Sequence, residues 1–462
     1  MHERVAQAAR NRLCVARTPV PRGSHVVHRT SSFPAAAVAK TPSLRRYRQH
    51  WRPAGACDTV VRVMAEQFQF DPFDERTRRN PFPLYAQARR EHPVYRHEGL
   101  PVVSVFRYDD IQAILRDPST WSNVFPPPPG FTRPDHLPPS MLMLDPPEHT
   151  RLRGLVQQAF TPRRVRELEP RIEAIAEQLA SHLVTRRTAD FVATFAYPLP
   201  VVVIAEMIGV PAEDRELFRH WSDALVENLG GGLLGPPSPE ALAKELAAVE
   251  AMRAYFVERV EERRRKPRED LLSALVAAEL EGSRLTFDEM LQMLVLLLVA
   301  GNETTRNLIA NAVYTLIEHP ESERQLRAHP EHVPGAVEEV LRFASPVQCD
   351  VRYLVRDTEV AGRHVEAGTI ALLWLGSANR DESVFPDPDV FDIARADNRH
   401  LAFGFGPHFC LGANLARLEA QVALRVLLRR VRQWQLATSD PLPLHPSLIF
   451  RAMTELPLEV RG

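Results

Sequence analysis

From residue 64 onward, apolar and polar positions follow the patterns of a folded and mostly helical domain. They predict helices over residues 81–90, 108–115, 148–185 with breaks at Pro162 and Pro170, 201–207, 211–229, 239–265, 269–279, 321–328, 333–343 and 414–430. One strand is expected over 100–105, and short strands with glycine-containing turns over 351–375. Strands and helices do not alternate as in βαβ units, and no internal repeat is visible. The sequence therefore predicts a mainly α fold with small β-sheets.

The longest helix is expected over residues 286–318. It begins at Thr286 with Glu289 three residues later, which is the pattern of a capping box, and it ends before Pro320. At 1.5 Å per residue, this helix is about 50 Å long. Because its middle is apolar on nearly all faces, we expect it to run buried through the centre of the domain.

Residues 1–63 differ from the rest of the chain, since they contain twelve arginines and lysines and only two acids. No apolar core follows Arg45 and Arg46, so a secretory or twin-arginine signal is not expected. Two interpretations stay open: an Arg-rich organelle transit peptide, or a disordered extension of a protein whose translation starts near residue 64. We favour the disordered extension, followed by a single domain over 64–462.

The composition excludes several classes of protein. The formal net charge is −1, so no overall field attracts nucleic acid or an anionic membrane. The longest apolar run, residues 293–300, is far shorter than the roughly 20 residues needed to span a bilayer. Four cysteines in 462 residues do not form a disulfide framework. We expect a soluble cytoplasmic protein with no transmembrane segment and no nucleic-acid partner.

The strongest chemical signal is the segment FGFGPHFCLG at residues 403–412. Three glycines and a proline predict a tight, irregular loop around Cys410, and a helix follows at once. A cysteine before a helix N-terminus faces the positive end of the helix dipole, which favours the thiolate. A lone cysteine is usually a small buried hydrophobe. Here, however, the glycines allow backbone to come close to something large and flat, and His408 adds a hydrogen-bond donor.

This segment resembles the haem-binding loop of the cytochrome P-450 family, the haem-thiolate monooxygenases, in their soluble bacterial type. The resemblance extends from near residue 73 to the C-terminus, with the motifs in family order. It implies the cytochrome P-450 fold, in which haem b lies between the long central helix and the helix after the cysteine loop. It also implies that Cys410 is the axial ligand of the iron and that Phe403 belongs to the haem site.

The second motif is AGNETT, residues 300–305, midway along the longest helix. Polar groups at the centre of an apolar helix are costly unless they are used. A threonine there is often bonded only to the carbonyl one turn back, but this does not explain the adjacent glycine and glutamate. The resemblance implies that Gly301 leaves room for dioxygen and that Thr304 with Glu303 delivers protons during oxygen activation.

A third motif pairs Glu339 with Arg342. Glutamate and arginine three residues apart form ordinary salt bridges on helix surfaces, and the same spacing recurs elsewhere in this chain. The surrounding sequence, GAVEEVLRFASP, makes this pair distinctive. The resemblance implies that the pair joins Arg395 in a structural cluster that fixes the fold around the haem and does no chemistry.

Four side chains are candidates to bind the two haem propionates. In DPPEHTRLR, His149 and Arg153 lie four residues apart and therefore on one face of a helix. Arg352 lies in a strand-like stretch, and His408 lies in the cysteine loop. Each alone would be an exposed histidine or a solvated arginine, but the resemblance places all four where the family has its propionate partners.

The substrate and the electron donor are less clear from the sequence. The resemblance implies that the proline-rich stretch before His149, residues 230–239 and residues 346–351 line or cover the substrate pocket, with Gln348 and Cys349 toward the ligand. An apolar small molecule would receive one oxygen atom from O₂, by hydroxylation or epoxidation. A ferredoxin and its reductase would supply electrons. Arg417 and the arginines of 425–432 are either its docking face or ordinary solvated cations.

Two alternatives stay open. A peroxide-driven or isomerising haem-thiolate enzyme needs no electron partner, but such enzymes often alter the Glu-Thr pair, which this chain keeps. A haem-less recruitment module on the same scaffold would tolerate the loss of Cys410 or Thr304, and both are present.

Overall fold

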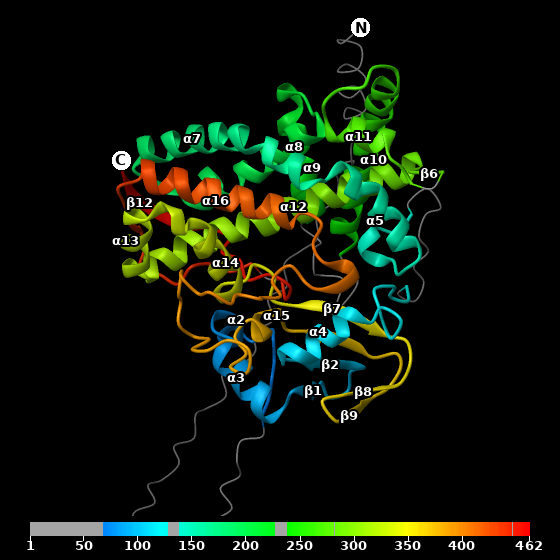
Figure 1. The fold of residues 1–462 in the computed structure, drawn as a ribbon, viewed down its shortest axis with the longest axis vertical. Helices are drawn as coiled ribbons and strands as arrows, with labels where there is room; N and C mark the ends of the chain where they lie inside the picture. Colours follow the sequence, from blue (N-terminus) through cyan, green and yellow to red (C-terminus); the bar gives the residue numbers. More distant parts are fainter. Residues whose placement is uncertain (1–67, 128–137, 227–237, 281, 446) are drawn as a thin grey trace, which may run out of the picture. The chain divides into compact units, whose positions relative to one another are not determined.

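The computed structural model describes residues 68–127, 138–226, 238–280, 282–445 and 447–462, and Figure 1 shows their arrangement. Residues 68–462 form one unit. The expected N-terminal extension, much of the proline-rich stretch and most of residues 230–239 lie outside the described residues. The division of the chain at residue 64 therefore stays a prediction.

Helices make up most of the described chain. Their bounds are α2 Glu75–Arg79, α3 Phe82–Glu91, α4 Tyr108–Arg116, α5 Glu148–Ala159, α6 Pro162–Glu167, α7 Glu169–Arg186, α8 Pro198–Ile208, α9 Arg215–Val226, α10 Pro239–Arg265, α11 Leu271–Ala277, α12 Phe287–Glu318, α13 Pro320–Ala328, α14 Val333–Phe343, α15 Leu375–Ala378 and α16 Ala413–Arg430. Single turns of tighter or wider helix occur at Met141–Met143, Val192–Ala196, Ala212–Asp214, Pro330–His332 and Gly406–His408. The mainly α fold predicted from the sequence is confirmed.

Prolines set several of these boundaries. Pro162 and Pro170 each stand in the first turn of a new helix, where a missing N–H costs no hydrogen bond, and they separate α5, α6 and α7 as expected. One expected boundary is wrong. The helix predicted to end at residue 279 stops with α11 at Ala277, because Glu279–Leu280 (β5) pairs with Ser283–Arg284 (β6). Gly282, at φ +78°, lies in the turn between these two strands.

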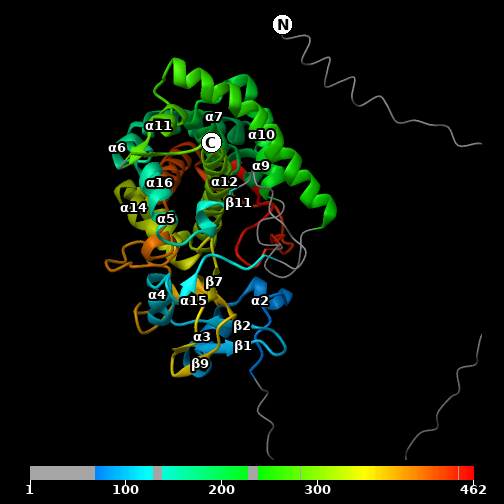
Figure 2. The same cartoon turned by 90° about the vertical axis from the view of Figure 1, so that its right-hand side faces the viewer.

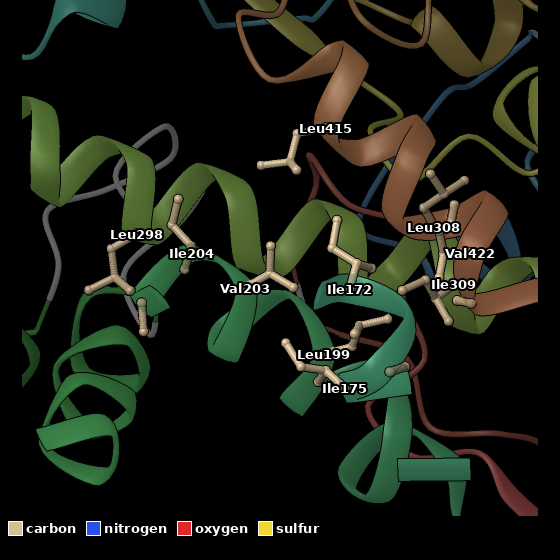
Figure 3. Packing of buried hydrophobic residues seen from close by; sticks show 14 of the residues in the cluster. Ile172, Ile175, Leu199, Val203, Ile204, Leu298, Leu308, Ile309, Leu415 and Val422 are labelled. Atoms are coloured by element: carbon tan, nitrogen blue, oxygen red, sulfur yellow. The ribbon is translucent and has the colours of Figure 1, made fainter. Parts of the chain in front are cut away.

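The long helix α12 organises the core. Thr286 and Glu289 form the predicted capping box, with each side chain bonded to the other residue's backbone N–H. Along its length α12 packs against α8, α9, α14 and α16. Figure 3 shows apolar side chains between α12 and its neighbours α8 and α16, including Leu298 and Leu308 of α12, Ile204 of α8 and Val422 of α16. The apolar middle of α12 is thus buried, as predicted.

Within the described residues, four small sheets complete the fold. The largest has the strand order β1 (Val94–Arg96), β2 (Val102–Val105), β10 (Ile370–Leu373), β7 (Asp350–Leu354) and β3 (Trp121–Ser122). Within it β10 runs parallel to β2 and antiparallel to β7, and Ala371 is paired with both Val103 and Arg352. The other sheets are β11–β12–β4 (Gln433–Leu436, Pro457–Arg461, Thr188–Asp190), β8–β9 (Thr358–Val360, Arg363–Val365) and β5–β6.

The five-stranded sheet has an apolar cluster on each face. Along β10, Ala371 and Leu373 belong to one cluster, and Leu372, followed by Trp374, belongs to the other, as the two-residue period of a strand requires. Figures 1 and 2 show this sheet with α2, α3 and α4 at one end of the unit, and α7, α10 and α11 at the other. No helix in the described ranges is long and apolar enough to cross a membrane.

Candidate functional site

The loop before α16 is held by backbone hydrogen bonds and two left-handed glycines. The amide of Cys410 donates to the carbonyl of Phe403 at 2.9 Å. Gly404 and Gly406 have φ of +70° and +71°, which L side chains rarely adopt. A Cβ at Gly406 would lie 2.5 Å from the carbonyl oxygen of Leu115. Glycine is therefore required where this loop passes α4, and the loop presents Cys410 at the start of α16.

The thiol of Cys410 is surrounded by protein but remains open on one side. Its side chain is exposed, yet burial by neighbouring atoms raises the pKa of the thiol. The backbone N–H groups of Gly412 and Ala413 and the charges of Arg153 and Arg417 act in the opposite direction and lower this pKa. The sulfur thus meets hydrogen-bond donors and cations, which stabilise a thiolate.

The four expected propionate partners converge beside Cys410. His149 comes from α5 and His408 from the turn before Cys410, and their ring centroids lie 3.9 Å apart. Burial, then Arg153, lowers the pKa of His149. Burial, then His149 and Arg352, lowers the pKa of His408 to about 4. Arg153 also donates to the carbonyl of Phe409 at 2.6 Å. Side chains from three distant parts of the chain therefore form one cluster of two guanidinium groups and two imidazole rings.

Two buried nitrogens in this cluster have no partner. His149 Nδ1 and His408 Nε2 make no hydrogen bond within the described structure. Leaving a buried polar atom unsatisfied costs about 1–3 kcal/mol, so such atoms often mark a bound group. Of the two arginines, Arg352 is buried and donates to Asp350 Oδ1 at 2.8 Å. The cluster therefore offers donors and positive charge to an acidic ligand.

On α12, Thr304 and Gly301 lie in the same helical turn, and their surroundings differ. The hydroxyl of Thr304 donates to the carbonyl of Ala300 at 2.8 Å, which is the bond expected of any threonine in a helix. Its oxygen keeps lone pairs that can accept a further hydrogen bond. A Cβ added to Gly301 would meet nothing within 4 Å. Open space therefore borders α12 at Gly301.

Glu303 is buried and engaged on its own helix. Its carboxylate forms an ion pair with Arg306 and accepts a hydrogen bond from Asn307 Nδ2 at 3.3 Å. Arg306 Nε in turn donates to Asn307 Oδ1 at 3.1 Å. The sequence interpretation did not include Arg306 or Asn307, although their spacing of three and four residues from Glu303 is the spacing of helix neighbours. Glu303 thus has its charge balanced close by.

The Glu339 cluster is assembled as the sequence suggested. Arg342 forms a two-pronged ion pair with Glu339, with distances of 2.8 Å and 2.7 Å, and Arg395 Nε lies 3.2 Å from Glu339 Oε2. The Glu339 and Arg342 side chains are fully buried. Asn398 and the amide of Asp392 also donate to Glu339. This network ties α14 to the segment before the cysteine loop.

The two residues expected to face a substrate are both buried within the protein. Cys349 is 1% exposed and packs in an aromatic cluster with Tyr85 and Trp374. Cys349 and Val351 share this cluster, whereas Asp350 and Arg352 are paired with each other, so strand alternation turns Cys349 away from Arg352. Gln348 is 5% exposed, and its amide donates to the Ser345 carbonyl at 2.7 Å.

Most arginines proposed for partner docking are already paired. Arg417 binds Glu338 at 2.7 Å and 2.9 Å. Arg425 pairs with Glu169, Arg429 with Glu173 and Glu177, and Arg430 with Glu177. The last three join α16 to α7. These side chains therefore act within the fold, and the docking face stays a proposal without their support.

Comparison with known proteins identifies the family. The sequence model of the family "Cytochrome P450" matches residues 64–336 and 331–452. The chain belongs to the cytochrome P450 family. It is 43% identical over 358 residues to Cytochrome P450 109 of Bacillus spizizenii, covering 77% of this chain and 85% of that protein.

Solved structures agree with this assignment. Cytochrome P450 CYP109Q5 from Chondromyces apiculatus superposes with a TM-score of 0.78 at 43% identity, covering 85% of this chain and 98% of that one. CYP109E1 from Bacillus megaterium, solved in complex with corticosterone, superposes with a TM-score of 0.76 at 37% identity. The match covers 84% of this chain and 100% of that one. The protein is a haem-thiolate monooxygenase with the cytochrome P450 fold, and its cofactor is haem b bound through a cysteine thiolate.

The residues of the candidate site fit haem b. Cytochrome P450 haem carries two propionate carboxylates, and the cluster at His149 and His408 holds unsatisfied nitrogens beside two guanidinium groups. Charge-assisted hydrogen bonds from such donors to carboxylates are among the strong ones. Cys410 presents a sulfur that is open on one side. Open space borders α12 at Gly301, where an added Cβ would meet nothing within 4 Å.

Proposed function

We propose that Cys410 is the axial ligand of the haem iron and that His149, Arg153, Arg352 and His408 bind its propionates. The observation that carries this proposal is the convergence of four cationic or donor side chains, two of them with orphaned buried nitrogens, on the loop that presents the cysteine. Phe403 supports the site through its carbonyl, which accepts from the Cys410 amide.

Haem with a thiolate ligand supplies the activation of O₂ and the transfer of one oxygen atom. The chain supports this chemistry in three ways. Backbone N–H groups at the start of α16 hold the sulfur of Cys410 and stabilise its negative charge. Thr304 holds a proton on Oγ1 at the edge of the open space along α12. Glu303 lies next to Thr304 in sequence, and its carboxylate, ion-paired with Arg306, would accept a hydrogen bond from a group that relays a proton.

We propose that the substrate is an apolar small molecule that is hydroxylated or epoxidised. The turns of α12 that lead to Gly301, residues 293–300, are entirely apolar, so a substrate lying along them would be held mainly by burial of apolar surface. CYP109E1, which shares 37% identity with this chain, was solved with corticosterone bound. A steroid is therefore a reasonable first ligand to test.

We further propose that the electrons come from a separate ferredoxin and its reductase in the cytoplasm. The distinguishing experiment incubates haem-loaded protein and a spectrally active ligand either with a surrogate ferredoxin system and NADPH or with hydrogen peroxide alone. Product 16 mass units heavier than the ligand, formed only with the ferredoxin system, would support the proposal. Product formed equally well with peroxide alone would favour the peroxide-driven alternative.

The assignment of Cys410 is tested by substitution. Cys410→Ser should abolish the strongly red-shifted Soret band of the ferrous carbon monoxide complex, because a serine oxygen does not replace the thiolate. Cys349→Ser is the matched control, since that thiol is buried in the sheet cluster and should not contribute to the band. A red-shifted band that survives Cys410→Ser and disappears in Cys349→Ser would reverse the assignment.

A further inference from the structure

A cavity of about 490 Å³ lies outside the candidate haem site. It is bordered by the C-terminal half of α12, the end of α14, the start of α3 and the segment that leads to β12. None of its lining residues is among the residues assigned to the haem. A volume of this size is in the range that holds small organic ligands.

Guanidinium groups stacked on aromatic rings form one wall. The guanidinium carbon of Arg380 lies 3.5 Å from the ring centroid of Phe82 and 3.8 Å from that of Phe343. That of Arg451 lies 5.2 Å from the same Phe82 ring. Two cations therefore share one aromatic ring, and a third ring, that of Tyr314, completes the lining.

The positive charge at this wall is only partly balanced. Arg380 pairs with Asp389 at 2.9 Å, and Asp389 is largely exposed. Arg451 donates to the carbonyl of Arg78 at 3.2 Å, and no carboxylate in the described part of the chain pairs with it. Burial, together with the charges of Arg342 and Arg451 and opposed by Asp389, lowers the pKa of Arg380 to about 10. An arginine cluster of this kind favours an anion.

The remaining charges define the rim. Arg79 is bound by Glu75 at 2.8 Å, so its charge is neutralised. Glu318 is exposed and also borders the cavity, where it opposes an anion. His319 donates a hydrogen bond from Nδ1 to the Thr315 carbonyl at 2.8 Å. The unbalanced positive charge is thus at Arg451, beside Phe82, and Glu318 borders the same cavity.

We propose that this cavity binds a small aromatic carboxylate, with its carboxylate on Arg451 and its ring against Tyr314 and Phe343. Arginine presents a planar fork that matches a carboxylate, and the aromatic lining favours a flat apolar body. The backbone of Arg451 is held in place by hydrogen bonds that do not involve its side chain. Its amide donates to the Pro346 carbonyl at 2.9 Å, and its carbonyl accepts from Asn311 Nδ2 at 3.1 Å.

The probe is 2-naphthoate, titrated by calorimetry into the haem-loaded full chain saturated with imidazole, which occupies the iron. We expect saturable binding with a dissociation constant below about 1 mM. Arg451→Gln should weaken it by at least about tenfold, the loss of one charge-assisted contact. Glu318→Gln should tighten it by about two- to fivefold, because a like charge leaves the rim. Arg163→Gln, on the exposed surface of α6, is the charge-matched control and should bind as the wild type does.

Several outcomes would overturn the proposal: no binding of 2-naphthoate, equal binding of the neutral 2-naphthamide, loss of binding on imidazole saturation, or unchanged affinity in Arg451→Gln. If Arg451→Gln does not fold, the Glu318→Gln variant still decides, because Glu318 is exposed and its replacement leaves the core intact. Unchanged or weaker binding in Glu318→Gln would then place the probe elsewhere.

Discussion

At the scale of single residues, Thr304 and Glu419 show how one polar group in an apolar helix is used or tolerated. Thr304 satisfies its hydroxyl proton on its own helix, three residues after the open space at Gly301. Glu419, on α16, is 3% exposed, and its Oε2 has no hydrogen-bond partner in the described structure. The first residue has a proposed chemical role, and the second carries a cost in stability.

Thr304→Ala should retain haem and substrate but lose control of proton delivery. General acid–base catalysis typically contributes a factor of about 10²–10⁴ to a rate. Because water can partly replace the hydroxyl, we expect the rate of product formation in Thr304→Ala to fall by a factor at the low end of this range. The measurement compares reducing equivalents consumed, hydrogen peroxide released and product formed. Thr304→Ser, which keeps the hydroxyl, should remain close to the wild type. Equal coupling in the alanine variant would mean that Thr304 bonds only its own helix.

Glu419 should make the protein less stable as the pH rises. Burial raises the pKa of this carboxyl from 4.5 to about 8, so the folded state favours the protonated form. The protonated Glu419 carboxyl therefore causes no loss of stability below its ordinary pKa of 4.5. As the pH rises from there through about 8, the free energy of unfolding falls because the unfolded state ionises more readily. At pH 7 the cost is about 3 kcal/mol, from 1.36 kcal/mol per pKa unit.

The measurement is the thermal midpoint of Glu419→Gln and wild type at pH 5 and pH 8. Glutamine keeps the shape of the side chain without the charge. The thermal midpoint of the variant should therefore exceed that of the wild type most at pH 8 and only slightly at pH 5. A difference that does not grow with pH would show that Glu419 is stabilised by a group that the described structure does not contain.

At the scale of elements, the cysteine loop depends on how closely α4 approaches it. Leu115 near the end of α4 leaves no room for a side chain at Gly406, and the φ of +71° is strained for any other residue. The Glu339 cluster holds the chain that enters this loop, since both Asp392 and Arg395 bond to Glu339. The loop is therefore fixed from two sides.

Gly406→Ala should lower the thermal midpoint and haem retention together. The strain and the clash with the Leu115 carbonyl should cost about 1–3 kcal/mol. Gly412→Ala is the matched control, because Gly412 has φ −84° and a Cβ there would meet nothing within 4 Å. Haem content after gel filtration and the thermal midpoint are the two readouts. Equal losses in both variants would contradict the role of α4.

At the scale of the whole molecule, the described chain from residue 68 contains every residue assigned to the haem, the cluster at Glu339 and the Arg451 cavity. The preceding segment differs in composition, with a large excess of arginine and many helix-breaking residues. Such a composition provides little apolar surface to bury.

Deletion of residues 1–62 should therefore leave haem content and the thermal midpoint unchanged. The truncated and full-length chains are compared after purification under the same conditions, with the carbon monoxide spectrum as a check on haem ligation. A fall of several degrees in the thermal midpoint would show that the N-terminal segment packs on the domain. It would contradict the predicted domain boundary near residue 64.

Much of the fold could be read from local patterns. The capping box at Thr286 and the prolines at 162 and 170 predicted helix boundaries because their effects act within one turn of backbone. The glycines around Cys410 predicted the tight loop for the same reason. The end of α11 was mispredicted, because pairing with β6 outweighs helix propensity at Glu279 and Leu280.

The sequence by itself determined the long apolar helix, the cysteine loop and, through family resemblance, the candidate haem ligands. Only the tertiary structure decided which side chains meet. It brought the rings of His149 and His408 together, turned Cys349 into the sheet cluster and bound Arg417 to Glu338. It also brought Arg380 and Arg451 onto one ring of Phe82. The physical reason is range: backbone preferences act over a few residues, whereas contacts between distant segments depend on how the helices and sheets pack.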